Sequence, residues 1–242
     1  MINYRYIIGK GLNRCEIAVL SGPTGNLLKR YPIGRHWPFD VLRFNRGVRP
    51  EVVFDVGANV GMTSLYIRRF LPDATIHAFE PVSATFRDLK QSVSHDSRIL
   101  PRNIALGDLD QTQTIEVDPC SQMSTLIASG SANRATEKVS VLKLDTYMAQ
   151  QNLAHIDVLK MDVQGFEMHL LQGAEASLKA RHIKFVYAEI GFTDGDRETA
   201  FFPEIHARLA AHSFSLCGFY EMWRQGSSKE RLGGCNALYM LN

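Results

Sequence analysis

The sequence predicts an α/β fold with a mostly parallel sheet, helices on both faces and a closing antiparallel strand. Three observations support this prediction. Short β-branched or aromatic runs alternate with segments of helical period. The run at residues 52–56 is almost continuously apolar, as in a strand that is covered on both faces. Two further strand-like runs follow the last helical pattern, and a length of 242 residues fits one large domain.

The first half of the chain is expected to form two βα units and a third strand. Residues 52–56 predict the first strand, and a helix over 62–71 follows and ends before Pro72. Residues 74–79 predict the second strand. The next helix is amphipathic, because its apolar residues are four, three and four positions apart; they are Val82, Phe86, Leu89 and Val93. Residues 98–106 predict the third strand.

The second half begins with an elaboration, residues 107–155, that a minimal βα unit does not need. Alternating runs at 114–117 and 138–144 predict added antiparallel strands around a Ser/Asn/Gly-rich loop at 121–133. The remaining expected elements are a strand at 156–161, a helix at 166–178, a strand at 183–190, a helix at 198–211 and closing strands at 213–219 and 235–241.

Composition narrows the class of protein. The formal net charge is +2 and 45% of residues are hydrophobic, which is typical of a globular protein and does not suggest a nucleic-acid partner. The four cysteines form no CxxC pair, so no metal site is predicted. Without a signal peptide or an integral membrane segment, we expect a cytoplasmic protein. Residues 50–242 are expected to form the main domain, and residues 1–49 an N-terminal cap or lid.

The turn after the first strand is the most informative stretch. Asp55, Gly57, Asn59 and Gly61 form a DxGxNxG pattern between a strand and a helix. Glycines there let a ligand approach the backbone, and the start of the helix offers free N–H groups. The spacing matches neither GxGxxG nor the phosphate-binding P-loop. We therefore predict a small-molecule site that does not cradle phosphate.

Glu80 ends the second strand, 19 residues after Gly61. An acidic residue at this position binds ribose hydroxyls in nucleoside-binding sheets. Taken alone, the glycines would fit a tight βα connection and Glu80 a solvated strand end. Together, in consecutive βα units, they predict a nucleoside-type cofactor, and the glycine arrangement favours S-adenosylmethionine over NAD.

Two carboxylates follow the fourth and fifth strands. Asp162 and Glu189 are expected at one edge of the sheet, where acid/base chemistry would take place. Asp162 fits a helix N-cap equally well, and Glu167 fits a residue that stabilises the helix dipole. Lys160 is a candidate partner for a carboxylate. His36 is a third catalytic candidate, although a packed or surface histidine is the more common situation.

Five segments in chain order match a known family: VVFDVGANVG (52–61), HAFEP (77–81), NIALGD (103–108), LKMDVQGFEMHLLQGA (159–174) and NALYM (236–240). In these segments the chain resembles the FkbM family of S-adenosylmethionine-dependent methyltransferases. The resemblance implies a class I methyltransferase sheet, which is Rossmann-like. It places Asp55, Gly57, Asn59 and Gly61 at the methionine end of the cofactor, Glu80 at the ribose, and Asn103, Ala105 and Asp108 on the adenine side. Gln164 departs from the family, which more often has Glu there.

The expected reaction is methyl transfer to a hydroxyl oxygen, with a sugar of a glycan, polysaccharide or natural product as the acceptor. A small-molecule or glycan partner follows from it. One alternative is a metal-dependent glycosyltransferase, since Asp108 with Asp110, and Asp194 with Asp196, have a carboxylate-x-carboxylate form. Another is a non-catalytic cofactor-binding module on the same fold. The acceptor and the oligomeric state stay open.

Overall fold

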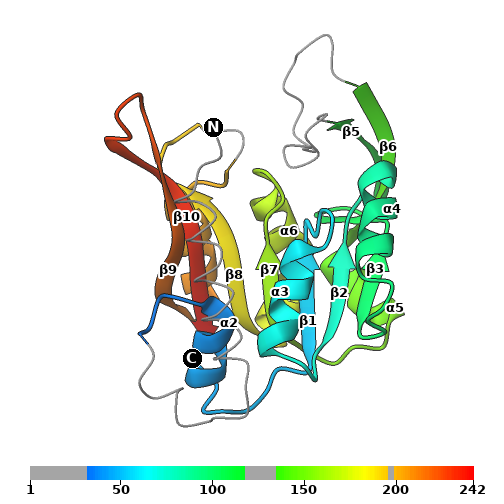
Figure 1. Cartoon of the computed structure of the whole chain (residues 1–242), viewed down its shortest axis with the longest axis horizontal. Helices are drawn as coiled ribbons and strands as arrows, with labels where there is room; N and C mark the ends of the chain where they lie inside the picture. The colour runs from blue at the N-terminus through cyan, green and yellow to red at the C-terminus, as the bar shows by residue number, and fades with distance from the viewer. Residues whose placement is uncertain (1–31, 118–134, 196–198) are drawn as a thin grey trace, which may run out of the picture.

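The computed structural model describes residues 32–117, 135–195 and 199–242. A seven-stranded sheet with the order β3-β2-β1-β7-β8-β10-β9 forms its centre (Figure 1). Its strands are β1 (Val52–Val56), β2 (Thr75–Phe79), β3 (Ile99–Arg102), β7 (Ile156–Met161), β8 (Ile183–Gly191), β9 (Phe214–Gln225) and β10 (Arg231–Leu241). Neighbours from β3 to β8 pair in parallel, and β10 is antiparallel to both β8 and β9. The predicted fold class is confirmed.

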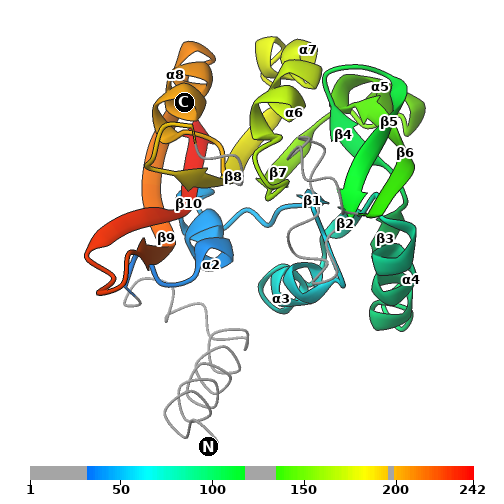
Figure 2. The same ribbon diagram turned by 90° about the horizontal axis from the view of Figure 1, so that it is seen from above.

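Helices cover both faces of this sheet, as Figure 2 shows. On one face lie α2 (Trp37–Phe44), α3 (Met62–Phe70) and α4 (Ser83–Ser92). On the other lie α5 (Leu144–Gln150), α6 (Glu167–Gly173), α7 (Glu175–Lys179) and α8 (Phe202–Ala211). Each face has its own hydrophobic core. Because both faces are covered, the central strands carry apolar residues at successive positions, which explains the continuous run in β1.

A small second sheet corrects the prediction of one third strand over 98–106. That segment forms β3 and then β4 (Ala105–Gly107), which belongs to a separate sheet with β6 (Ala135–Lys143) and β5 (Gln111–Val117). Asn103 lies at the break and donates to the carbonyl oxygens of Glu80 and Pro81, at 3.0 and 2.9 Å, so the chain turns there. The antiparallel pairing of β5 with β6 is confirmed. The predicted loop at 121–133 lies outside the described residues.

The predicted helix over 166–178 is two helices. Asp145 explains the division, because its carboxylate accepts from the backbone N–H groups of Ala176 and Ser177 at 2.8 and 2.9 Å and so starts α7 as a new helix. Gly173 ends α6 in close contact with β4: a Cβ there would stand 1.8 Å from the carbonyl oxygen of Gly107. The helices α2 and α5 were not predicted.

The described part of the predicted N-terminal cap is built into the core. Trp37 of α2 stacks on Tyr187 of β8 with ring centroids 4.4 Å apart. Asp40 accepts a hydrogen bond of 2.9 Å from the hydroxyl of Tyr220 in β9. The division of the chain between residues 49 and 50 stays a prediction, and residues 1–31 lie outside the described residues.

Among the helices that the structure describes, none has both the length and the apolar character that a membrane span requires.

Candidate active site

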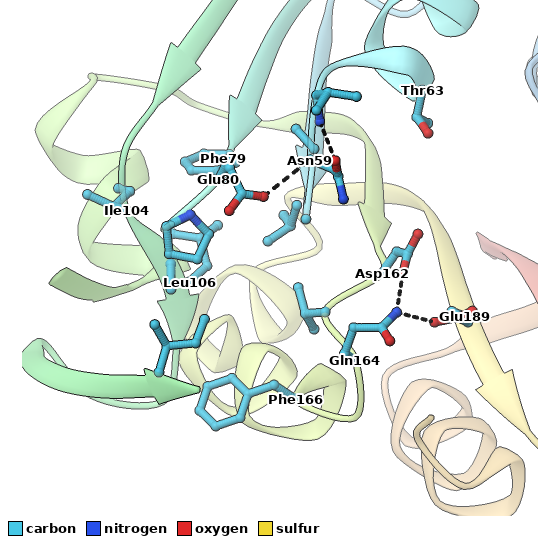
Figure 3. Close-up of a pocket in the computed structure, with 18 of the residues that line it drawn as sticks. Asn59, Thr63, Phe79, Glu80, Ile104, Leu106, Asp162, Gln164, Phe166 and Glu189 are labelled. Atoms are coloured by element: carbon cyan, nitrogen blue, oxygen red, sulfur yellow. Dashed lines mark hydrogen bonds between the residues drawn. The ribbon is translucent and has the colours of Figure 1, made fainter. Parts of the chain in front are cut away.

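A cavity of about 460 Å³ opens at the carboxyl ends of the parallel strands (Figure 3). Parallel α/β sheets bind their ligands at this edge. One end of the cavity is apolar and includes Phe79, Ile104 and Leu106. At the other end lie Asp162 and Glu189. Asp162 directly follows β7, and Glu189 lies near the end of the neighbouring strand β8. We call these the apolar end and the acidic end.

The glycine turn forms one wall between the two ends. Gly57 has a φ of +75°, and a Cβ on it would stand 1.8 Å from the carbonyl oxygen of Asp162. The backbone N–H groups of Gly57 and Ala58 donate to the carbonyl oxygen of Phe79, at 3.1 and 2.9 Å. The turn is thus fixed between β2 and β7. A side chain at Gly57 would push the turn away from β7, so glycine is required there.

Glu80 is held by backbone donors. Its Oε2 accepts from the N–H of Asn59 at 3.1 Å and its Oε1 from the N–H of Val82 at 2.9 Å. The side chain is nearly buried, and this burial raises its pKa to about 7, although both hydrogen bonds oppose the change. A carboxylate has about four lone-pair sites. Glu80 therefore keeps acceptor capacity for ligand hydroxyls after its backbone bonds are made.

Asp55 and Lys160 form a buried ion pair behind the turn. Lys160 Nζ lies 3.0 Å from Asp55 Oδ1 and donates to the carbonyl oxygen of Gly57 at 3.1 Å. Asp55 also accepts from the hydroxyl of Ser64 at 2.6 Å. Burial by itself lowers the pKa of Lys160, but the charges of Asp55 and Asp162 raise it above its usual value. The predicted pairing of Lys160 with a carboxylate is confirmed, and the pair supports the turn from behind.

Gln164 joins the two carboxyl groups of the acidic end. Its Nε2 is 3.2 Å from Asp162 Oδ1 and 3.2 Å from Glu189 Oε2, as Figure 3 shows. Lys160 Nζ stands 3.5 Å from Asp162 Oδ2. Burial, together with the charge of Asp162, raises the pKa of Glu189 to about 9. Asp162 is more open, with 38% of its side chain exposed. The acidic end therefore presents one accessible carboxylate and one that tends to keep its proton.

Glu167 supports this arrangement from the start of α6. It is fully buried, and its Oε1 accepts from the N–H of Val163 at 2.9 Å. Burial raises its pKa to about 7. The residue lies behind the cavity wall and shapes the turn that carries Asp162 and Gln164.

The structure brings together six of the predicted site residues. Gly57, Asn59, Glu80, Ala105, Asp162 and Glu189 all line the cavity. Asp55 and Gly61 lie behind its wall, where Gly61 starts α3 at a φ of +88°. Asn103 holds the chain at the break between β3 and β4, and Asp108 Oδ2 is 3.1 Å from His169 Nδ1.

His36 lies elsewhere. Its Nδ1 is 2.8 Å from the hydroxyl of Tyr66, and its ring packs against Phe70 of α3. It is not among the residues that line the cavity, so the structure does not join it to Asp162 and Glu189.

Sequence reasoning missed the bridging role of Gln164 and the apolar lining. Gln164 has a φ of +53°, which is uncommon for a residue other than glycine. Its place between Asp162 and the next helix was the available signal. Phe79 and Leu106 belong to predicted strands, and a strand pattern does not show which of its residues reach a cavity.

Comparison with known proteins agrees with this geometry. The model of the methyltransferase FkbM domain matches residues 55–219. The chain belongs to the FkbM methyltransferase family. Its cofactor is accordingly S-adenosylmethionine, as predicted. Asp110, one of the carboxylates of the glycosyltransferase alternative, is engaged in the fold, where it accepts from the N–H of Lys143 and the hydroxyl of Thr146 at 2.6 and 2.8 Å.

Several curated relatives of this FkbM methyltransferase are similar over part of their length. Methyltransferase 1 of Beauveria bassiana is 31% identical over 51% of this chain and 58% of its own length. The 31-O-demethyl-FK506 methyltransferase FkbM of Streptomyces tacrolimicus is 28% identical over 72% of this chain and 77% of its own. The hexuronic acid methyltransferase AglP of Haloferax volcanii is 26% identical over 62% and 61%. The chain thus spans under two thirds of the Beauveria and Haloferax relatives.

Solved structures support the fold. The METTL16 MTase domain superposes with a TM-score of 0.50 and 10% sequence identity, over 86% of this chain and 66% of that one. At this identity the likeness concerns the fold alone.

Proposed function

We propose that this FkbM methyltransferase transfers the methyl group of S-adenosylmethionine to a hydroxyl oxygen, with a sugar hydroxyl of a small molecule or glycan as the favoured acceptor. The position of Asp162 in the cavity is the observation that carries the proposal. A hydroxyl is a weak acid, so its methylation benefits from a base at the reacting atom. Asp162 is the carboxylate that lines the acidic end with an open side chain.

The cavity fits the cofactor in chemistry along its length. Phe79, Ile104 and Leu106 offer an apolar surface for the adenine. Glu80 has acceptor capacity left for the two ribose hydroxyls. We place the methionine part at the acidic end, beside the glycine turn and the first residues of α3, whose N–H groups have no acceptor within the helix. The bound cofactor supplies an already activated methyl group.

The chain's own residues then supply position and a proton acceptor. Lys160 fixes the Gly57 carbonyl and Asp162 relative to each other. Asp162 accepts the hydroxyl proton at a carboxylate oxygen. Glu189 is joined to Asp162 by the hydrogen bonds of Gln164 and is the second residue that we assign to catalysis. His36 has no part in this proposal.

The names of two relatives support an oxygen acceptor. One is called a 31-O-demethyl-FK506 methyltransferase and the other a hexuronic acid methyltransferase. The second name leaves open whether a hydroxyl or a carboxyl group is modified. The experiment must therefore separate a methyl ether from a methyl ester.

Transfer of radiolabelled methyl to a panel of neutral sugars, uronic acids and nucleotide sugars tests the proposal. We expect label in a product that survives mild alkali, because an ether resists hydrolysis and an ester does not. Asp162→Asn should abolish most of the label. Label that is released as methanol in alkali would show a carboxyl acceptor and would overturn the hydroxyl assignment.

The alternative of a non-catalytic module makes a different prediction in the same assay. Such a module would bind S-adenosylmethionine without transferring label to any acceptor, including those in an extract of the source cells. Ether formation that depends on Asp162 would exclude it.

A further inference from the structure

The acidic end carries more negative than positive charge. Several charged or titratable groups surround Glu189 on β8: Lys160 and Asp162 from β7, Glu167 from α6, and, near Asp162 and Lys160, Glu221 from β9. Lys160 is the cation among these groups, and Asp55 already pairs with it at 3.0 Å. Lys160 Nζ also lies 3.5 Å from Asp162 Oδ2, so this one positive charge is shared among the carboxyl groups of Asp55, Asp162 and Glu189.

Gln164 allows these two carboxyl groups to exist in either of two charge states. Its NH₂ group has two donor hydrogens, and its Nε2 lies 3.2 Å from an oxygen of each carboxyl group. Hydrogen bonds from an amide stabilise a carboxylate but add no positive charge. Two carboxylates can thus be held side by side when another positive charge is present, and one of them keeps a proton otherwise. Burial and the nearby charge of Asp162 raise the pKa of Glu189 to about 9.

The cofactor and its product differ in charge at this end of the cavity. S-adenosylmethionine carries a positive sulfonium, and the demethylated product S-adenosylhomocysteine carries a neutral sulfide. We propose that the Asp162–Glu189 pair is a proton store matched to this difference: it releases one proton when S-adenosylmethionine binds and keeps that proton when S-adenosylhomocysteine binds. The inference rests on the placement of the cofactor under Proposed function.

This release and uptake of one proton keeps the net charge of the acidic end constant through the reaction. With the sulfonium present, both carboxyl groups are ionised. The charges of Asp162, Glu189 and the sulfonium then sum to minus one. Asp162 and Glu189 then take up the proton that the acceptor hydroxyl loses as its oxygen bonds the methyl carbon, and the electron pair of the broken carbon–sulfur bond stays on sulfur. After the transfer, the charges of Asp162, Glu189 and the sulfur again sum to minus one, so the net charge of the acidic end does not change during the chemical step.

Titration calorimetry in two buffers with different ionisation enthalpies, such as phosphate and Tris at pH 7.5, measures the protons released on binding. We expect S-adenosylmethionine to release about one proton more than S-adenosylhomocysteine. Glu80 has a pKa near 7 and also adds to the proton count, but it faces the ribose that both ligands share. The contribution of Glu80 therefore cancels when the proton release of one ligand is subtracted from that of the other. Equal proton release by the two ligands would overturn the proposal without any variant.

Two variants locate the effect. Glu189→Gln should still bind S-adenosylhomocysteine but should lose the difference in proton release. Glu80→Gln is the matched control: it should weaken both ligands and leave the difference in place. A difference that survives Glu189→Gln would assign the proton to another group and reject the pair. These outcomes do not depend on the acceptor, so a failed search for a methyl ether would count against the proposed function alone.

Discussion

Glu80 and Glu189 are both glutamates at the carboxyl end of a strand, and burial raises the pKa of both, yet their partners differ. Glu80 accepts from two backbone N–H groups, those of Asn59 and Val82. Glu189 accepts from the side chain of Gln164 and lies beside Asp162. Backbone N–H groups cannot rotate away from an acceptor as a side chain can, so the carboxylate of Glu80 is held in one position. A partner carboxyl can gain or lose a proton, so Glu189 belongs to a group whose charge responds to a ligand.

The largest expected effect is at the acidic end. Asp162→Asn should lower the rate of methyl transfer by about 10²–10⁴-fold, the usual contribution of a general base, with little change in cofactor affinity. Asp157→Asn is the matched control on the same strand, because Asp157 lies at the opposite end of β7, where it accepts from the N–H groups of Glu51 and Val52 and stands 3.4 Å from His155 Nε2. Initial rates on the acceptor found by label transfer measure both. A folded Asp162→Asn protein with normal turnover would limit Asp162 to a structural role.

Lys160 connects the two regions, so its loss should affect both. Lys160→Met leaves Asp55 buried without its cation, and we expect the free energy of unfolding to fall by about 3–5 kcal/mol. Urea unfolding measures it. Adding Asp55→Asn to Lys160→Met removes the unpaired charge and should restore part of the loss. If the double variant is no more stable than Lys160→Met alone, the ion pair is not the cause.

Glu80→Gln tests the backbone-held region. The amide keeps the shape but has one acceptor oxygen in place of two, and it loses the charge. We expect S-adenosylmethionine and S-adenosylhomocysteine to bind more weakly by about 1–3 kcal/mol each. Calorimetry with both ligands gives the comparison. An equal loss for the two ligands is required, because the ribose is common to them; a loss confined to one would place Glu80 at the sulfur.

The smallest effect is the pH dependence that Glu80 adds. Its pKa of about 7 in the folded protein exceeds the ordinary 4.5. Its contribution to stability is therefore fully present below pH 4.5 and is lost as the pH rises through about 7. Ribose hydroxyls donate to the carboxylate, so cofactor affinity should change in the opposite direction and weaken as the pH falls below 7. Thermal unfolding of the wild type and of Glu80→Gln at pH 5 and pH 8 isolates the first effect.

The same contrast explains what the sequence could predict. Asp55, Gly57, Asn59 and Gly61 lie within one turn, and Glu80 lies in the next βα unit, so local pattern and strand order were enough to place the turn and Glu80 at one edge of the sheet. The nearly continuous apolar run of β1, which only Asp55 interrupts, predicts a strand with both faces covered, and the structure confirms it.

The acidic end could be predicted only in part. Asp162 and Glu189 were expected at neighbouring strand ends, but the bridge through Gln164 depends on its left-handed backbone, which no periodicity reveals. The break of the third strand at Asn103 depends on two long-range hydrogen bonds to the end of β2. The start of α7 likewise depends on Asp145, which is 31 residues from Ala176 in sequence. Tertiary contacts of this kind override local propensity.

The buried Asp55–Lys160 pair also sets an order in time. Lys160 follows Asp55 by 105 positions, so at a synthesis rate of about 5–20 residues/s Asp55 precedes its cation by about 5–20 s. A carboxylate does not enter an apolar interior unpaired. On the ribosome, we therefore expect the glycine turn to reach its final position only after β7 has been made. The cofactor site would then form late in folding, although the turn that identifies it is made early.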